Sequence, residues 1–201
     1  VFESKLYGDE PISLHQASAL DLSFLGAETF DVVLLLGPLY HLEKERDRLR
    51  AIMEARRVMK KEGTMFLATI NHDMVPYTET MRNPLWFNNN TYDHDTFRLV
   101  DIPFIFHTLE ESRKMLQDTG LVLQREIASD GMSELLGAQL EEMDAESFHQ
   151  YLRYHLLHCE DKEGLGRTNH FLFQCGQRES IDVSYPDDEN VLEEMKKIQA
   201  Y

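Results

Sequence analysis

The sequence has only two cysteines, Cys159 and Cys175, and this scarcity excludes a fold held together by several disulfides. We therefore expect a reducing, cytoplasmic setting. No apolar run approaches the roughly 20 residues that a membrane-spanning helix requires. No secretory signal peptide is visible either. These absences favour a globular protein that neither crosses a membrane nor depends on disulfide bonds.

Positive charge is also scarce. The 20 Lys and Arg residues stand against 36 Asp and Glu residues, which gives a formal net charge of −16. Such a protein repels nucleic-acid phosphates and anionic lipid headgroups, so we expect neither nucleic acid nor membrane as a partner. The length of 201 residues, 42% of them hydrophobic, suits one domain with its own core.

The sequence lacks the usual patterns of nucleophilic and metal sites. No Ser-His-Asp or Cys-His arrangement stands out, and Gly-x-Ser-x-Gly is absent. His155 and His158 would share a helix face, with Cys159 beside them, but no Cys-x-x-Cys accompanies them. A structural zinc site needs four well-placed ligands, so we predict no metal site.

The most informative stretch that is present lies at residues 30–36, where an apolar run follows Asp31 and ends at Gly37-Pro38. A continuous run of this kind predicts a strand buried on both faces of a parallel sheet. Open α/β sheets bind ligands beyond the carboxyl ends of their strands. The loop that carries Gly37, Tyr40 and His41 is therefore the candidate site.

The following residues complete a strand–helix–strand unit. Residues 43–61 carry one apolar stripe and predict a helix, with Lys60 and Lys61 in its last turn and Gly63 as its stop. Residues 64–70 contain no charge and predict the next strand.

The rest of the chain predicts a cap and the remaining elements. In residues 71–106 three prolines and three consecutive asparagines argue against long elements, yet aromatic residues are frequent, as in a lid or binding insertion. Thr108 and Glu111 form a capping box that begins a helix over 108–119. Strands are expected at 12–17, 121–128 and 169–175, helices at 132–143 and 145–158, and a charged turn at 161–167. We expect one domain over 1–179, in which 71–106 and 130–160 are cap or substrate-side insertions, and a linker with an amphipathic helix over 180–201.

Four motifs resemble those of the class I S-adenosylmethionine-dependent methyltransferases, in particular the small-molecule, ubiquinone-methyltransferase-like group. They are Gln-Ala-Ser-Ala-Leu-Asp-Leu at 16–22, Phe-Asp-Val-Val-Leu-Leu-Leu-Gly-Pro-Leu-Tyr-His-Leu at 30–42, Glu-Ala-Arg-Arg-Val-Met-Lys-Lys-Glu-Gly at 54–63 and Phe-His-Thr at 106–108. The resemblance spans residues 12–175. It implies an α/β, Rossmann-like sheet of seven mostly parallel strands with helices on both faces and an antiparallel last strand.

Against that family the sheet is incomplete at its amino-terminal end. Residues 12–17, 30–36, 64–70, 121–128 and 169–175 correspond to strands three to seven, while strands one and two have no counterpart. The Gly-rich turn and the ribose-binding acid that follow those two strands are missing with them. We hypothesise a further amino-terminal segment in the natural protein, because Val32, Val33 and Leu34 otherwise border an open apolar edge that invites pairing with another chain.

The resemblance also implies roles for individual residues. Ser18, Ala19 and Leu20, together with Leu36 and Gly37, correspond to the cofactor-binding positions. Ser18 replaces an acid that usually accepts the adenine amino group, and a hydroxyl accepts more weakly than a carboxylate. His41 is the catalytic candidate, because a histidine titrates near neutral pH. The expected substrate-binding residues are Tyr40, Tyr77, Trp86 and His107.

Two functions follow from these expectations. The first is an enzyme that transfers a methyl group from S-adenosylmethionine to a small organic acceptor. The second is a non-catalytic binding or assembly module of the same fold, which the missing Gly-rich turn favours. A homodimer through the uncovered edge is compatible with both.

Overall fold

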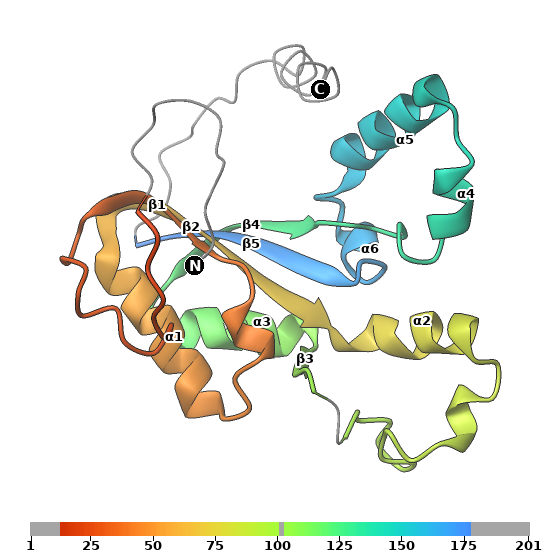
Figure 1. Ribbon diagram of the computed structural model, residues 1–201, viewed down its shortest axis with the longest axis horizontal. Helices are drawn as coiled ribbons and strands as arrows, with labels where there is room; N and C mark the ends of the chain where they lie inside the picture. The colour runs from red at the N-terminus through yellow and green to blue at the C-terminus, as the bar shows by residue number, and fades with distance from the viewer. Residues whose placement is uncertain (1–12, 101–102, 178–201) are drawn as a thin grey trace.

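The computed structural model describes residues 13–100 and 103–177, so the expected linker and helix at 180–201 lie outside the described residues. Its centre is a five-stranded sheet (Figure 1). The main path runs β1 (Phe30–Leu35), β2 (Met59–Asn71), β5 (His170–Gly176) and β4 (Val122–Ala128). The short β3 (Phe106–His107) pairs with the end of β2.

The strand directions agree with the sheet that the resemblance implies. β1 and β2 are parallel, whereas β5 is antiparallel to both of its neighbours, β2 and β4. The last strand of the sheet is thus inserted antiparallel between two earlier strands. The Rossmann-like α/β prediction is confirmed for this part of the sheet.

Two helices build the core on one face of the sheet (Figure 1). They are α1 (Glu45–Val58) and α3 (Leu109–Asp118). Ile52 and Ala55 from α1 and Leu116 from α3 are almost completely buried, and they pack in one cluster with Leu67 of β2 and Phe173 of β5. Burial of such side chains contributes roughly 1.5–3 kcal/mol each.

The remaining helices lie beyond the ends of the strands. A first group follows β1 and β2: the 3₁₀ helices η1 (Pro38–Tyr40), η2 (His72–Met74) and η3 (Trp86–Asn88), with the helix α2 (Val75–Arg82). A second group follows β4: α4 (Gly137–Glu141), α5 (Ala145–His158) and α6 (Lys162–Leu165). Figure 1 shows α2 with the segment after it, and α4 with α5, as separate projections from the sheet. None of the helices in the described ranges is long and apolar enough to cross a membrane.

Several sequence signals act as predicted. The Thr108 hydroxyl accepts from the Glu111 N–H while the Glu111 carboxylate accepts from the Thr108 N–H, so the capping box begins α3. Gly120 follows the helix with φ 68°, the left-handed conformation that glycine adopts at least cost. Asp144 caps α5 through the Ser147 N–H.

The predicted end of the first helix is wrong. α1 ends at Val58, and β2 begins at the next residue, so Lys60, Lys61 and Gly63 belong to a strand. Pairing with β1 overrides the helical signal there: Lys60 Nζ lies 2.8 Å from the Asp31 carboxylate. At Gly63 a Cβ would come within 2.9 Å of the Asp31 carbonyl oxygen, so glycine allows the two backbones to approach.

Four further expectations are corrected. Residues 13–17 form no strand, because no described strand lies beside them to accept their hydrogen bonds. Pro76 stands in the first turn of α2, where proline starts a helix rather than preventing one, so the insertion contains a regular element. The helix predicted at 132–143 is reduced to α4, and the turn at 161–167 contains α6.

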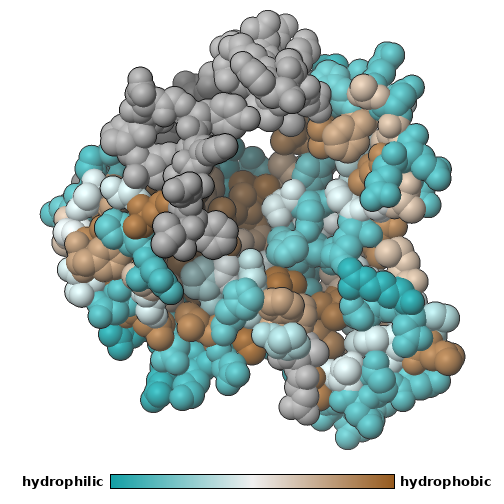
Figure 2. Space-filling view, viewed as in Figure 1, coloured by the Kyte–Doolittle hydropathy of each residue, from teal (hydrophilic) through white to brown (hydrophobic). Residues whose placement is uncertain are grey.

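The expected open edge is present in the described sheet. β1 is its outer strand, and Val32 and Leu34 expose 55% and 62% of their surface. Leu34 pairs across the sheet with Phe66 of β2, on the face opposite α1 and α3. Figure 2 shows hydrophobic surface in the hollow over the strands. An apolar edge of this kind favours association with another chain.

We therefore predict that Leu34→Lys reduces self-association without loss of stability, because the side chain already faces solvent. The neighbouring Leu35→Lys is the matched control. Leu35 is 7% exposed and packs in the core, so a lysine there should cost about 3 kcal/mol or more. Sedimentation and thermal unfolding measure both effects. Equal losses of stability in the two variants would contradict the assigned faces of β1.

Candidate functional site

The candidate site lies at the carboxyl ends of the parallel strands β1 and β2. Because the strands are parallel, the residues that follow Leu35 and those that follow Asn71 emerge at the same edge of the sheet. β3 extends this edge, since His107 pairs with Asn71. Two walls result, one from the loop after β1 and one from η2 and α2.

The first wall leaves room for a Cβ at Gly37. Its φ of 169° is extended, and a Cβ built there would have the Tyr40 hydroxyl as its nearest neighbour, at 3.7 Å. The backbone therefore does not require a glycine at this position. The neighbouring Leu36 is 51% exposed and offers an apolar surface. A ligand can approach the main chain closely along this stretch.

An aromatic cluster closes the first wall. The His41 ring lies 4.9 Å from the Tyr40 ring and 5.1 Å from the Phe104 ring, measured between centroids. The Ile105 N–H donates to the Tyr40 carbonyl at 2.9 Å, which fixes the end of the cap insertion against η1. His41 is exposed, and no acidic side chain in the described ranges hydrogen-bonds to its ring. It is accessible to a substrate but has no orienting carboxylate.

The loop that contains Ser18 is held on α1. The Leu22 N–H donates to Glu54 Oε2 at 2.8 Å, and Arg57 donates to the Leu22 carbonyl at 2.8 Å. The hydrogen bonds from Arg57 and from the Leu22 N–H lower the pKa of Glu54. The Ser18 hydroxyl accepts from the Leu20 N–H at 3.2 Å, so part of its accepting capacity is already used inside its own turn.

Ala19 and Leu20 pack against the core cluster, whereas Ser18 is exposed. Glu54 and Arg57 give a physical reason for the motif at 54–63, because their side chains hydrogen-bond to the backbone of the loop that follows Ser18.

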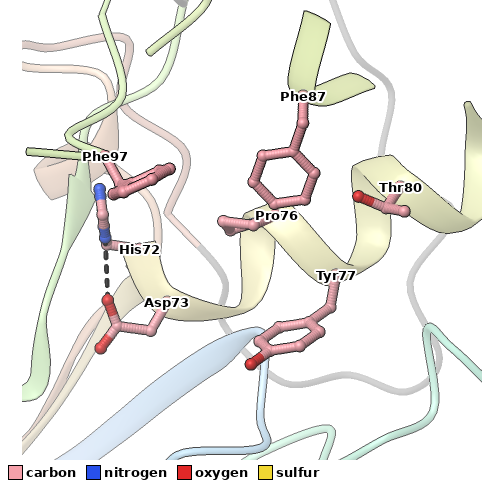
Figure 3. A pocket seen from close by; sticks show the side chains of 7 residues that line it. All are labelled: His72, Asp73, Pro76, Tyr77, Thr80, Phe87 and Phe97. Atoms are coloured by element: carbon pink, nitrogen blue, oxygen red, sulfur yellow. Dashed lines mark hydrogen bonds and ion pairs between the residues drawn. The ribbon is translucent and has the colours of Figure 1, made fainter. Parts of the chain in front are cut away.

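The second wall encloses a cavity of about 620 Å³ (Figure 3). Its side chains come from η2 directly after β2, from the first turns of α2, from η3 and from the loop that follows η3. Three of them are aromatic and one is a carboxylate. The lining residues are His72, Asp73, Pro76, Tyr77, Thr80, Phe87 and Phe97.

The hydrogen bonds around His72 define its tautomer. The Leu99 N–H donates to His72 Nε2 at 3.3 Å, so this nitrogen is the acceptor and Nδ1 carries the hydrogen. Nδ1 donates to Asp73 Oδ1 at 2.9 Å, the bond drawn in Figure 3. Asn71 anchors the turn, because its side chain accepts from the Asp73 N–H and donates to the Thr168 carbonyl. His72 is thus a neutral positioning group with both nitrogens engaged.

Trp86 does not line the cavity but packs against Phe87, which does. It is 5% exposed, stacks on Tyr92 at 5.0 Å and contacts Phe87 edge-on at 4.8 Å. The Tyr92 hydroxyl donates to the Phe87 carbonyl at 2.6 Å. These contacts hold Phe87 at the cavity, and Tyr77 alone of the expected substrate-binding residues lines it.

Phe97 reaches the cavity at a cost in backbone strain. Its φ is 57°, the left-handed region that bulky residues rarely adopt, and this costs roughly 1–2 kcal/mol. A turn around Asp93 maintains it: the Phe97 N–H donates to the Asp93 carbonyl, and the Thr96 N–H and hydroxyl donate to the Asp93 carboxylate. Hydrogen bonds from Thr96 lower the pKa of that carboxyl group.

His107 is placed away from the cavity. It is 3% exposed, and both ring nitrogens lack hydrogen-bond partners. Burial, and secondarily the positive charge of Arg48, lower its pKa to about 4, so the ring is neutral at neutral pH. The structure therefore does not bring all the predicted residues together: Tyr40 and His41 form one wall, Tyr77 belongs to the other, and Trp86 and His107 are buried.

Sequence reasoning missed His72 and Asp73. Both directly follow Asn71, the last residue of β2, so a polar run at the end of a predicted parallel strand was the available signal. His72 and Asp73 were overlooked because the insertion was interpreted from its aromatic residues.

Comparison with known protein families supports the resemblance to methyltransferases that the motifs indicated. Residues 2–67, which are 66 of the 201 residues, match the family model described as a methyltransferase domain. This part of the chain is therefore similar to the methyltransferase domain family. The match contains β1, the loop with Gly37 and most of β2, and it stops before the cavity residues. The resemblance that the motifs indicated is confirmed for this third of the chain.

Solved structures with related folds are similar at low identity. An S-adenosylmethionine-dependent methyltransferase from Thermotoga maritima shares 13% identity over 81% of this chain, with a TM-score of 0.43. One from Methanosarcina mazei shares 14% over 82%, with a TM-score of 0.45. One from Mesorhizobium loti shares 12% over 84% of this chain and 71% of its own length, with a TM-score of 0.47.

The chain spans 62% of the Thermotoga protein and 66% of the Methanosarcina protein. Among curated proteins no match was found. Because these TM-scores lie below 0.5, the fold is established by the strand order and directions rather than by the structural comparison.

A second histidine–carboxylate pair stabilises the strand ends near the site. Asp130 Oδ2 accepts from His170 Nδ1 at 2.6 Å, and the Asp130 carboxylate also accepts from the Thr168 hydroxyl and the Asn169 N–H. Burial opposes ionisation of Asp130, but the bonds from His170 and Thr168 outweigh it and lower its pKa. The hydrogen bond to Asp130 raises the pKa of His170.

This pair predicts a pH-dependent stability. The raised pKa of His170 gives stabilisation that is complete below about 6.5 and is lost as the pH rises through the folded value. The lowered pKa of Asp130 gives stabilisation that is present above about 3.8 and is lost as the pH falls through the folded value. Asp130→Asn should therefore lower the melting temperature most near pH 5–6, by roughly 3–6 °C.

The control is Asp161→Asn, which removes the carboxylate of the exposed His158–Asp161 pair and should change the melting temperature by about 1 °C or less. Scanning calorimetry from pH 4 to 9 measures both variants. An Asp130→Asn effect that is constant with pH would contradict the assigned charges.

Proposed function

We propose that the protein transfers a methyl group from S-adenosylmethionine to a small organic acceptor. The observation that carries this proposal is the juxtaposition at one sheet edge of the open backbone at Gly37, within the methyltransferase-like third of the chain, and a cavity that begins directly after β2. Ligands of open α/β sheets bind at such an edge. The chain spans only part of its structural relatives, so the activity is a proposal for the whole protein.

The residues present fit one side of the cofactor. Gly37 leaves room for close approach to the main chain, and Leu36 offers an exposed apolar surface suited to a purine or thioether. Ser18 retains a hydroxyl near the positions at which Ala19 and Leu20 enter the core. When bound, S-adenosylmethionine supplies an electrophilic methyl group on a sulfonium.

Methyl transfer from S-adenosylmethionine requires little acid–base catalysis by the protein. A lone pair of the acceptor forms a bond to the methyl carbon, the carbon–sulfur bond breaks, and sulfur keeps the electron pair. The rate depends on alignment of the two reactants and on exclusion of water. Tyr40 and His41 would border the acceptor from one wall and Tyr77 from the other. His41 is the group placed to remove a proton if the acceptor must lose one.

The alternative is a non-catalytic binding or assembly module. Two observations favour it: the Ser18 hydroxyl is engaged within its own turn, and the apolar outer strand β1 offers a surface to a second copy of the chain. The two functions differ in whether the protein binds S-adenosylmethionine at all.

Calorimetric titration with S-adenosylmethionine and S-adenosylhomocysteine tests the proposal. We expect binding by the protein, and we expect Gly37→Leu to weaken it by at least about tenfold, because the side chain would fill the space at the main chain. Gly137→Leu is the matched control, since a Cβ at Gly137 meets no atom within 4 Å. Absence of binding by the unmodified protein, at a normal melting temperature, would favour the assembly module instead.

A further inference from the structure

We propose that the cavity after β2 binds an organic cation, an amine with an apolar body, between the Asp73 carboxylate and the rings of Tyr77, Phe87 and Phe97. This inference rests on the proposed function, because it names the class of acceptor that the same site would take. It concerns residues outside the segment that matches the methyltransferase family model.

The charge of the cavity is negative and uncompensated. Asp73 is the only ionised side chain among the lining residues, and its side chain is 65% exposed. His72 occupies Oδ1 with its Nδ1–H but contributes no positive charge, because its Nε2 accepts from Leu99. Oδ2 has no hydrogen-bond donor among the contacts of Asp73 in the described ranges. A carboxylate in this situation attracts a cation and repels an anion.

The rings add a second preference for positive charge. The rings of Tyr77, Phe87 and Phe97 line the cavity (Figure 3), and the negative face of an aromatic ring attracts a cation. Trp86 and Tyr92 hold Phe87 from behind, and the strained turn holds Phe97. A bulky side chain kept at positive φ beside a cavity is the kind of strain that clusters at functional sites.

The size and the apolar surface of the cavity add a third preference. Thr80 lines the cavity, and within the described residues its buried Oγ1 has no hydrogen-bond partner. The apolar surfaces of Pro76 and the rings suit an aryl or alkyl body, and the volume of about 620 Å³ accommodates a small molecule of that type. The net charge of −16 attracts cations from solution.

The charges of the reactants and products balance if an amine is the methyl acceptor. An ammonium ion first loses a proton to water, since only the free amine carries a lone pair. The nitrogen then bonds to the methyl carbon as the carbon–sulfur bond breaks, so positive charge moves from sulfur to nitrogen. Asp73 stabilises that developing charge, and the product ammonium releases a proton to water if it still has one.

The single tryptophan makes the test direct, because Trp86 packs edge-on against Phe87 and its fluorescence reports on the cavity. The protein is titrated at pH 7, without cofactor, with 2-phenylethylamine, 2-phenylethanol and 3-phenylpropionate. We expect saturable binding of the amine, binding of the alcohol at least tenfold weaker, and no binding of the carboxylate. Equal affinities for the amine and the alcohol would overturn the proposal.

The Asp73→Asn variant keeps an oxygen that accepts from His72 and removes the charge. It should weaken amine binding by at least tenfold and leave alcohol binding unchanged. Asp95→Asn makes the same charge change in the same insertion at a carboxylate that does not line the cavity, and it should alter neither affinity. An unchanged amine affinity in Asp73→Asn, or an equal loss in both variants, would refute the assignment.

Phe97→Gly separates binding from folding. Glycine relieves the positive φ, so the melting temperature should stay the same or rise while amine binding falls several-fold. A lower amine affinity together with a lower melting temperature would instead indicate a structural role for Phe97. Because no cofactor is present, amine binding with no binding of S-adenosylmethionine would defeat the methyl-transfer proposal and leave the cation site standing.

Discussion

The parallel pairing of β1 with β2 is the constraint on which the rest of the structure depends. It directs the loop after Leu35 and the turn after Asn71 to one edge, and it places α1 across one face of the sheet. β5 then fixes β2 from the other side in the antiparallel direction, and β3 adds His107 beside Asn71. Without this pairing the two walls of the site would not face the same region of space.

The segment at residues 71–106 shows how a largely irregular segment obtains a defined shape. Its start is fixed by the Asn71 side chain, which bridges Asp73 and Thr168, and its end is fixed by the bond from Ile105 to Tyr40. Between these anchors, Trp86 and Tyr92 form a small separate core. Aromatic side chains on a short segment can bury enough surface to replace a regular sheet or helix layer. The cavity therefore has walls that are fixed by packing rather than by the central sheet alone.

Two parts of the described sheet lack a neighbour: the outer side of β1 and the loop at Gly37. On the outer side of β1, apolar side chains meet solvent where a neighbouring strand would normally pair with them. At the carboxyl edge, Gly37 supplies only one side of a cofactor site.

Much of the local structure was determined by the sequence itself. The apolar run after Asp31 predicted a strand, which is β1, but the exposed Val32 and Leu34 show that the expected burial on both faces is wrong. The Thr108–Glu111 pair predicted the start of α3. The antiparallel last strand was implied by the resemblance to the methyltransferases. These features depend on neighbours in the chain or on hydrophobic periodicity, which sequence displays directly.

Tertiary structure alone decided the rest. Lys60 and Lys61 became part of a strand because Asp31 and the β1 backbone were there to pair with them, and residues 13–17 did not because no described strand lies beside them. Trp86 and His107 were removed from the site by burial, and Asp73 entered it through a turn anchored from a distant segment. Such outcomes depend on contacts between residues far apart in the chain, and no local pattern encodes them.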